Sequence, residues 1–390
     1  MRQRVVLFVT SGTSSTTVRA ANRGSRRAAL LACLVCLLAA PVAARADVTW
    51  EVEGAGWGHG IGMSQWGALG YAKHGKGWEG ILHHYYRHTK IRRANGNKIR
   101  VLLQSGEASV DFTEASRACG KDLNPSGTYT AVRDGSGVHL RSADGDDLGA
   151  CGGSLTATGG GSIRVAGKGA YRGTLLVVPR EAGGLYAINS VSLEGYVKGV
   201  VPNEMPYDWP LDALRAQAVA ARSYGLATRV TGVFDQFDDT RSQVYGGLSS
   251  ETSATNEAVS DTAGKVVKSG GRIATTFYFS TSGGRTENIE HGFVGSDPKP
   301  YLKSVKDPFE EASPYHRWKE TFSQAEMEAK LGSLVEGSLQ SIDVTQRGKS
   351  PRIVQARIVG SDGSTEVSGP TLQSRLGLRS TWAFFNKTGG

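Results

Sequence analysis

The chain has 390 residues and a formal net charge of +9, with 45 basic and 36 acidic side chains. Seven arginines and no acidic residue precede Asp47, which leaves 38 basic against 36 acidic residues and a net charge of +2 in the rest of the chain. So small an excess gives no indication of nucleic-acid binding. The length after residue 46 suffices for two domains or for one large, elaborated domain.

Residues 1–46 have the pattern of a secretory signal peptide. Six arginines and no acid occur in residues 1–27, an apolar run extends from 28 to 40, and the sequence Ala44-Arg45-Ala46 supplies small residues for cleavage. The apolar run is shorter than the roughly 20 residues that a membrane span needs, which disfavours the alternative of a retained anchor. We therefore expect a secreted mature protein.

Residues 47–91 form the next block, with a strand-like run at Val48–Val52, a glycine-rich turn and two helical stretches. The glycines between Gly56 and Gly62 alternate, unlike the G-x-G-x-x-G spacing of a dinucleotide loop. Alternating glycines favour a close approach of the backbone to a ligand or to another strand.

Histidines are concentrated in the same block. His84 and His88 are four residues apart, so on one helix they would share a face and could chelate zinc. No cysteine accompanies them, and we interpret the group as a polar helix surface without a metal. The five histidines of the block are His59, His74, His83, His84 and His88.

Residues 92–180 are rich in glycine and serine and contain short alternating runs such as Val138–Arg141, which is typical of a β-rich subdomain. Cys119 and Cys151 are an even pair in a chain expected to be exported, and they predict a disulfide. Neither cysteine lies in a motif with a histidine, which disfavours a catalytic thiol.

Residues 181–390 contain the clearest predicted helix, over 210–228, with Asp208 as a capping residue and Pro210 in the first turn. Alanines fill several of its faces, so we expect it to be largely buried. Its polar residues Gln217, Arg222 and Tyr224 then need partners, and they either brace a loop or face a cleft.

Glu204 is the first candidate for acid–base chemistry. It lies between the apolar pair Val200-Val201 and Met205-Pro206, and apolar surroundings raise the pKa of a carboxyl group by desolvation. In a loop, however, a glutamate is more often solvated. Glu194 is the alternative, but we interpret it as a structural acid in the first turn of a short helix capped by Ser192.

A hydroxyl-rich glycine turn, Ser280–Thr286, follows the strand-like run Ala274–Phe279. Its hydroxyls and free N–H groups suit the binding of sugar hydroxyls or of an acid group. The G-x-S-x-G pattern of a serine nucleophile is absent, so a binding turn is the favoured interpretation.

Several long motifs belong together. The run from Asn189 to Pro206, N-S-V-S-L-E-G-Y-V-K-G-V-V-P-N-E-M-P, precedes A-L-R-A-Q-A-V-A-A-R-S-Y from Ala213, and later come Q-V-Y-G from Gln243 and F-Y-F-S-T-S-G-G-R-T from Phe277. These motifs resemble the stage II sporulation protein D and amidase-enhancer family. The resemblance covers roughly residues 170–385 and the block at 47–91.

The resemblance implies a peptidoglycan lytic transglycosylase that cuts the MurNAc–GlcNAc bond, with Glu204 as its one acid and base, no cofactor and no metal. The alternative is a non-enzymatic amidase enhancer that binds peptidoglycan and activates a cell-wall amidase. Peptidoglycan strands are the expected partner, with a cell-wall amidase and division or sporulation proteins as further candidates, and no nucleic acid. The implied location is secreted and cell-wall associated. The substrate-binding residues expected from matching positions are His59, Gln65, Gln217, Arg222, Tyr278, Ser280 and Ser282.

The expected fold is α+β, with a mixed sheet, a buried alanine-rich helix, the β-rich subdomain at 92–180 and a catalytic domain at 181–390. The G-W-G-H-G-I-G-M-S-Q-W-G-A block from Gly56 resembles a segment that closes the chain in relatives. A circular permutation would explain this order, and it predicts that Trp50–Gly56 lies beside Thr381–Phe385.

Overall fold

A computed structural model describes residues 48–94 and 98–389, which fall in one compact unit. The predicted signal peptide at 1–46 lies outside the described residues. In the described part of the chain, no helix is both long and apolar enough to cross a membrane.

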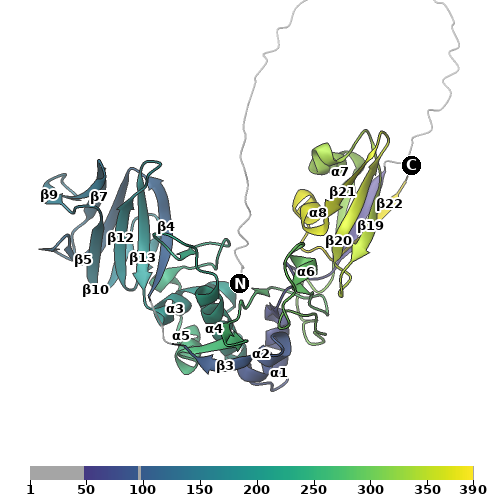
Figure 1. The fold of residues 1–390 in the computed structure, drawn as a ribbon, viewed down its shortest axis with the longest axis horizontal. Helices are drawn as coiled ribbons and strands as arrows, with labels where there is room; N and C mark the ends of the chain where they lie inside the picture. Colours follow the sequence, from purple (N-terminus) through teal and green to yellow (C-terminus); the bar gives the residue numbers. More distant parts are fainter. Residues whose placement is uncertain (1–47, 95–97, 390) are drawn as a thin grey trace, which may run out of the picture. The chain divides into compact units, whose positions relative to one another are not determined.

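The largest sheet in the described residues has eleven strands, in the order β14-β4-β13-β12-β10-β5-β7-β8-β9, with β11 beside β10 and β6 beside β5 (Figure 1). Its neighbours are antiparallel except β14 and β4, so the sheet is mixed, as predicted. Strands from both sides of residue 180 join this sheet. The predicted boundary at residue 180 between a β-rich subdomain and a catalytic domain therefore stays a prediction. The strands are β4 (Ile99–Glu107), β5 (Ser109–Ala118), β6 (Lys121–Asp122), β7 (Tyr129–Asp134), β8 (Gly137–Ser142), β9 (Asp147–Ala150), β10 (Leu155–Val165), β11 (Gly169–Tyr171), β12 (Thr174–Pro179), β13 (Leu185–Val191) and β14 (Gln236–Phe237).

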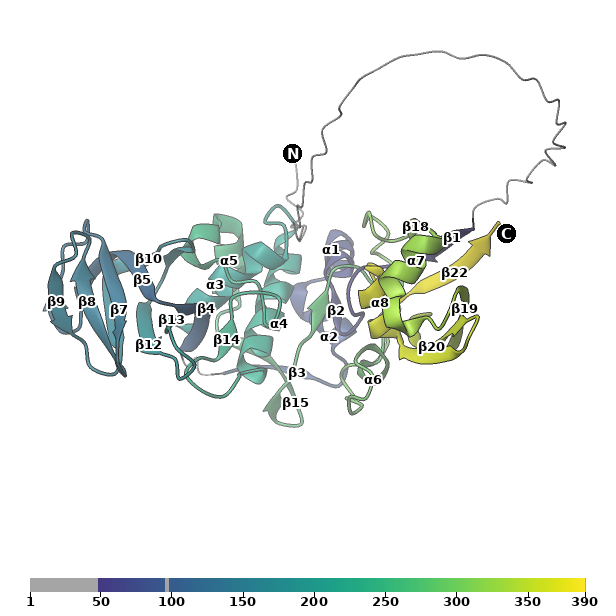
Figure 2. The same cartoon turned by 90° about the horizontal axis from the view of Figure 1, so that it is seen from above.

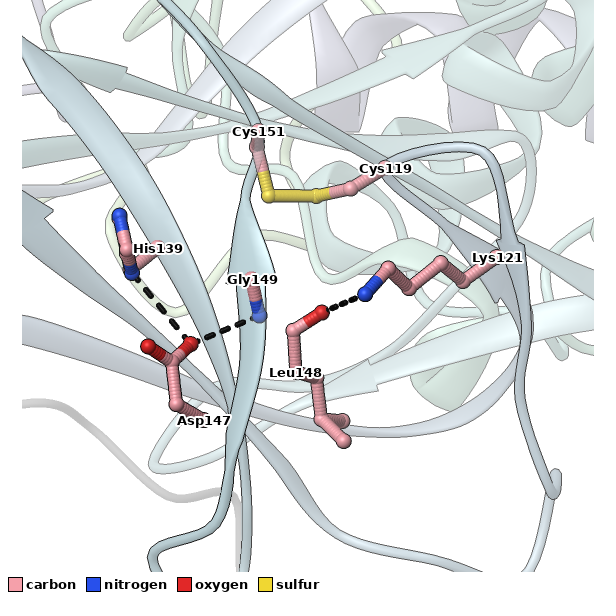
Figure 3. The surroundings of a disulfide bond; sticks show 7 residues. All are labelled: Cys119, Lys121, His139, Asp147, Leu148, Gly149 and Cys151. Carbon is pink, nitrogen blue, oxygen red and sulfur yellow. Dashed lines mark hydrogen bonds and ion pairs between the residues drawn. A yellow bond between two sulfur atoms is a disulfide. The ribbon is translucent and has the colours of Figure 1, made fainter.

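A disulfide closes one part of this sheet, where Cys119 follows β5 and Cys151 follows β9, with their Cα atoms 4.9 Å apart (Figure 3). This confirms the predicted pair. The same region holds His139 between two carboxylates, those of Asp134 and Asp147, and the ammonium group of Lys121 donates to the carbonyl oxygen of Leu148. All of these contacts lie within the β-rich region, and the disulfide and the Lys121 contact join strands that are not neighbours in the sheet.

Helix α4 (Leu211–Ala227) is buried between two hydrophobic cores, as its alanine content predicts. Ala218 and Ala221 pack with the large sheet and with α3 (Leu193–Glu204), while Ala216 and Val219 belong to a second core. Small side chains let the neighbouring elements approach closely. The predicted cap was wrong: Pro210 occupies the N-cap position, and no side chain caps the helix there.

The second core includes residues of the N-terminal helices α1 (Gln65–Lys73) and α2 (Trp78–Tyr85). Around it lie α5 (Ser253–Asp261) and α6 (Ile289–Gly292), while the 3₁₀ turn η1 (Gly247–Ser250) packs against α3 and β11. Two small sheets complete this part. One contains β3 (Lys90–Arg93), β15 (Lys265–Ser269) and β16 (Arg272–Ile273), and the other pairs β2 (Met63–Ser64) with β17 (Tyr278–Phe279) in parallel.

The third core brings the two ends of the described chain together. Strand β1 (Thr49–Gly54) lies between β18 (Trp318–Ser323) and β22 (Ala383–Thr388), with Gly54 opposite Ala383 and Val52 opposite Phe385 (Figure 2). The segments expected to be neighbours are therefore side by side. A circular permutation is nevertheless not supported, because chain ends lie close together in many domains whatever their history. The other elements here are α7 (Gln324–Leu331), η2 (Gly332–Leu334), β19 (Leu339–Arg347), β20 (Ile353–Gly360), β21 (Ser364–Ser368) and α8 (Gly369–Leu376).

Candidate functional site

A cavity of about 560 Å³ lies where the N-terminal block meets α3, α4 and β17. Aromatic rings form much of its wall, together with hydroxyl and amide groups. Among the residues that the structure describes, Glu204 is the one acidic residue that lines it. The lining residues are Trp57, Gly58, His59, Gln65, Glu204, Tyr224, Thr240, Ser242, Gln243, Val244, Phe277, Tyr278, Phe279, Ser280 and Phe293.

Glu204 is the last residue of α3, so the prediction that it lies in a loop was wrong. The helix begins where the Ser192 hydroxyl accepts a hydrogen bond from the Gly195 N–H, and it ends at Met205, whose backbone is extended. Glu204 is half-buried, so its carboxyl group reaches the cavity without being fully solvated. The carboxylate also lies at the negative end of the helix dipole, where an anion is disfavoured.

Burial raises the pKa of Glu204 from 4.5 to about 7. Interactions with the Val244 N–H, Tyr278 and Gln65 oppose this shift but do not cancel it. The Val244 N–H donates to Oε1 at 3.0 Å, so the acidic proton of the neutral form belongs on Oε2. Near neutral pH the side chain therefore exchanges readily between the acid and its conjugate base.

A hydrogen-bonded chain fixes the tyrosine beside this carboxyl group. The Tyr278 hydroxyl donates to Oε1 of Gln243 at 2.7 Å, and Nε2 of Gln243 donates to the Tyr196 hydroxyl at 2.9 Å and to the Ala221 carbonyl oxygen at 3.3 Å. Gln243 is buried, and burial raises the pKa of Tyr278 well above its ordinary value. The tyrosine thus remains a neutral hydroxyl group at the cavity wall.

His59 lines the cavity as a neutral ring. The Ile61 N–H donates to Nδ1 at 3.0 Å, so the ring proton belongs on Nε2, which then donates to the Tyr278 carbonyl oxygen at 3.1 Å. Burial lowers the pKa of His59 to about 4. With both ring nitrogens occupied, the histidine holds the β17 backbone in place and has no free nitrogen for proton transfer.

The N-terminal block reaches Glu204 itself through Gln65, whose Nε2 donates to the Glu204 carbonyl oxygen at 3.0 Å. Parallel pairing of β2 with β17 places Met63 beside Tyr278. The alternating glycines make this approach possible: Gly62 has a φ of +77°, and a Cβ there would lie 2.0 Å from the Phe277 carbonyl oxygen. The predicted close backbone approach is confirmed at this position.

Three of the residues expected to bind substrate do not line the cavity. The fully buried Arg222 forms an ion pair with Glu194, with Nη2 and Oε2 2.7 Å apart, so it braces α4 against the start of α3. Ser282 is buried, and its hydroxyl accepts a hydrogen bond from the Gly284 N–H at 3.0 Å. Gln217 is buried too, and neither polar atom of its side chain has a hydrogen-bonding partner among the described residues. Tyr278, Ser280, His59 and Gln65 do line the cavity.

Gln243 and the Val244 N–H are parts of the site that could not be predicted from the sequence. Both stand in the Q-V-Y-G motif, which carried the family resemblance, but no pattern linked that motif to a carboxyl group 40 residues earlier. A backbone N–H also carries no residue-type signal.

The predicted helix face shared by His84 and His88 does not exist. Helix α2 ends at Tyr85, and His88 has a left-handed φ of 58°. His84 instead contacts the Lys306 carbonyl oxygen at 2.9 Å, and burial lowers its pKa to about 4. Within the described ranges, no group of three or more His, Cys, Asp or Glu side chains could hold a metal ion.

Comparison with known proteins confirms the resemblance drawn from the motifs. A family model described as Stage II sporulation protein matches residues 181–268, which include α3 and α4. The chain is similar to Stage II sporulation protein D of Bacillus subtilis (strain 168), 34% identical over 212 residues that cover 50% of this chain and 60% of that protein. The protein of the same name from Bacillus amyloliquefaciens is 32% identical over 223 residues, 53% of this chain and 63% of that protein. The amidase enhancer of Bacillus subtilis (strain 168) is 43% identical over 142 residues, 36% of this chain and 19% of that protein. The matches thus span less than two thirds of each relative.

Proposed function

Given that residues 181–268 carry the domain of the stage II sporulation protein family, we propose that this chain is a peptidoglycan lytic transglycosylase of the cell wall. It would cleave the bond between MurNAc and GlcNAc with Glu204 as the acid and base. The observation that carries the proposal is one half-buried carboxyl group, with a pKa of about 7, in a cavity large enough for sugar residues.

In the first step, neutral Glu204 donates the proton on Oε2 to the glycosidic oxygen as the bond to C1 breaks. The resulting carboxylate then takes the proton of the C6 hydroxyl of the same sugar, whose oxygen forms the new bond to C1. The product is a 1,6-anhydro sugar, and Glu204 is left protonated as at the start. Val244 holds Oε1 throughout, which leaves Oε2 free to exchange the proton.

The absence of a second carboxylate from the described cavity wall supports this chemistry over hydrolysis. Retaining and inverting glycoside hydrolases both need a pair of carboxyl groups. A sugar hydroxyl that attacks within its own ring needs no activated water and no second acid. The proposal therefore requires only the groups that line the cavity.

The rest of the cavity wall suits a sugar chain. Trp57, Phe279 and Phe293 offer apolar ring surfaces, and Thr240, Ser242 and Ser280 offer hydroxyl groups. Trp57 is exposed at the rim, where its ring meets Tyr315 edge-on with the ring centres 4.4 Å apart. Apolar rings with a few placed polar groups are the usual make-up of a small-molecule site.

The decisive experiment incubates the protein with peptide-free glycan strands and detects anhydro-sugar ends by mass spectrometry. Glu204→Gln keeps the shape but cannot donate a proton, and we expect the rate to fall by about 10²–10⁴-fold. Glu257→Gln is the matched control, because Glu257 is exposed on α5 and has no ion-pair partner among the described residues. Equal rates for wild type and Glu204→Gln would refute the enzymatic proposal.

A second candidate function is favoured by the 43% identity to the amidase enhancer. In that case the cavity binds wall glycan, and the protein activates a separate cell-wall amidase without cutting glycan itself. Purified protein would then yield no anhydro ends, while addition of an amidase would release stem peptides faster. Export is common to both candidates and depends on the predicted signal peptide at 1–46.

A further inference from the structure

A second cavity, of about 500 Å³, lies on the small sheet formed by β3, β15 and β16, and no acidic residue lines it among the described residues. Lys90, Arg92 and Arg93 come from β3, and Lys268 comes from β15. His88 and the turn glycines Gly270 and Gly271 complete the wall. We call this cavity the basic pocket.

The cations of the basic pocket are uncompensated. None of Lys90, Arg92, Arg93 and Lys268 forms an ion pair within the described residues, and the three on β3 are exposed. The sequence explains why, since residues 80–106 and 262–286 contain no aspartate or glutamate. The pocket thus stands out from a chain that is nearly neutral after residue 46.

Strand register brings like charges directly opposite each other twice. Lys90 pairs with Lys268, and Arg93 pairs with Lys265. Directly opposite side chains have Cβ atoms roughly 5 Å apart, and like charges at that separation destabilise a sheet. Two ammonium groups so close together can meet on one anion, which would remove their repulsion.

We propose that the basic pocket binds a flexible wall polymer with repeating phosphodiester groups. A phosphodiester offers acceptor oxygens to two converging cations, and a planar guanidinium such as that of Arg92 can donate to it through two N–H groups. The choice of a wall polymer rests on the proposed function, which places the protein where such polymers occur.

Other polyanions fit the pocket less well. Single-stranded nucleic acid is usually held by aromatic rings that stack on the bases, and no Trp, Tyr or Phe lines the described pocket. A membrane surface is usually bound with apolar anchors beside the cations, and the pocket wall has none in the described residues.

The basic pocket is close enough to the Glu204 cavity to serve the same substrate. Gly271 of the pocket and Phe277 of the cavity are six residues apart, so their Cα atoms are separated by at most about 22 Å. A glycan strand that carries a phosphodiester polymer could therefore contact both sites. In this arrangement the basic pocket selects strands that carry the anionic polymer.

The test measures binding of fluorescent poly(glycerol phosphate) by anisotropy. We expect Lys90→Glu/Arg92→Glu to weaken binding at least tenfold, and wild-type affinity to fall roughly 50-fold between 50 and 200 mM salt if four cations take part. The matched control is Arg141→Glu/Arg375→Glu, which removes two exposed arginines elsewhere and changes the net charge equally. Thermal melting followed by circular dichroism checks that each variant is folded.

Three outcomes would overturn the proposal: equal weakening in the control, equal affinity for polyglutamate of the same charge, or tighter binding of duplex DNA or anionic vesicles.

Glu204→Gln should still bind the polymer, because Glu204 lies in the other cavity. Wild-type protein that binds the polymer but does not cleave glycan would refute the transglycosylase proposal alone. Unselective binding with cleavage intact would refute the basic pocket alone.

Discussion

The Glu204 cavity and the basic pocket differ in the sign, the number and the burial of their ionisable groups. In the cavity, one carboxyl group lies among aromatic rings, and burial shifts its pKa to about 7. The pocket holds four cations, of which the three on β3 are exposed, and Lys90 and Lys268 face each other across a strand pair. Both arrangements destabilise the folded state. We infer that each is kept for what it does to a ligand, whereas the paired charge of Arg222 and Glu194 serves the fold.

The largest effect is expected where a charge is paired. Arg222→Met leaves the Glu194 carboxylate beside a buried apolar side chain, and it also removes donors to the Val259 and Lys265 carbonyl oxygens. The Glu194 side chain is 35% exposed, which lowers the ion-pair part below the about 3–5 kcal/mol of a fully buried pair. The two unpaired carbonyl oxygens add about 1–3 kcal/mol, so we expect a total loss of about 4 kcal/mol. Urea unfolding of the variant checks this. A loss below 1 kcal/mol would remove the contrast between structural and functional charges.

Loss of the disulfide is expected to come next. Cys119→Ser/Cys151→Ser frees a loop with a sequence separation of 32 residues, which destabilises by about 3.7 kcal/mol in the chain-entropy model. Glycan cleavage should stay unchanged at temperatures where the variant is folded, because these residues do not line either cavity. Cleavage lost without unfolding would mean that the β-rich region shapes the active cavity.

Glu204→Gln is expected to stabilise the fold while it abolishes cleavage. The folded pKa lies above the ordinary value of 4.5, so wild-type stability decreases as the pH rises from 4.5 to 7. Above pH 7 the amide variant should be more stable by on the order of 2 kcal/mol, with the advantage disappearing below pH 4.5. Thermal unfolding at pH 4 and pH 8 measures the difference. The reverse sign would show that Glu204 is ionised and well solvated.

The pH profile of cleavage tests the same carboxyl group by a kinetic route. Since the proposed first step needs neutral Glu204, kcat/KM should fall about tenfold per pH unit above a pKa of about 7. A profile that stays flat to pH 9 would exclude Glu204 as the acid. Glu257→Gln should reproduce the wild-type profile.

The smallest effect is expected in the basic pocket. Lys90→Glu places a carboxylate, in place of an ammonium group, opposite Lys268. The opposite charges should raise the free energy of unfolding by about 0.2–1 kcal/mol. The gain should shrink in 1 M salt, because screening weakens exposed pairs. Chemical denaturation at two salt concentrations checks both statements. A destabilised variant would mean that the Lys90 side chain packs against the fold.

The sequence by itself determined what depends on near neighbours in the chain. Ser192 caps α3 with Glu194 in its first turn, alanines make α4 a buried helix, and apolar neighbours of Glu204 predict a raised pKa. Such features follow from local backbone preferences and from side chains within a few residues. The cysteine pair was also predictable, because removal of the predicted signal peptide would leave two cysteines, which have one possible intramolecular pairing.

Only the tertiary structure decided which distant groups meet. Arg222 was expected to line the substrate cavity, yet its side chain pairs with Glu194 instead. The contacts of Val244 with Glu204 and of Gln243 with Tyr278 could not be predicted from any residue pattern. The basic pocket likewise depends on the register of β3 against β15, strands more than 170 residues apart. Side-chain types limit which partners are possible, but the choice among them depends on the packing of whole helices and strands.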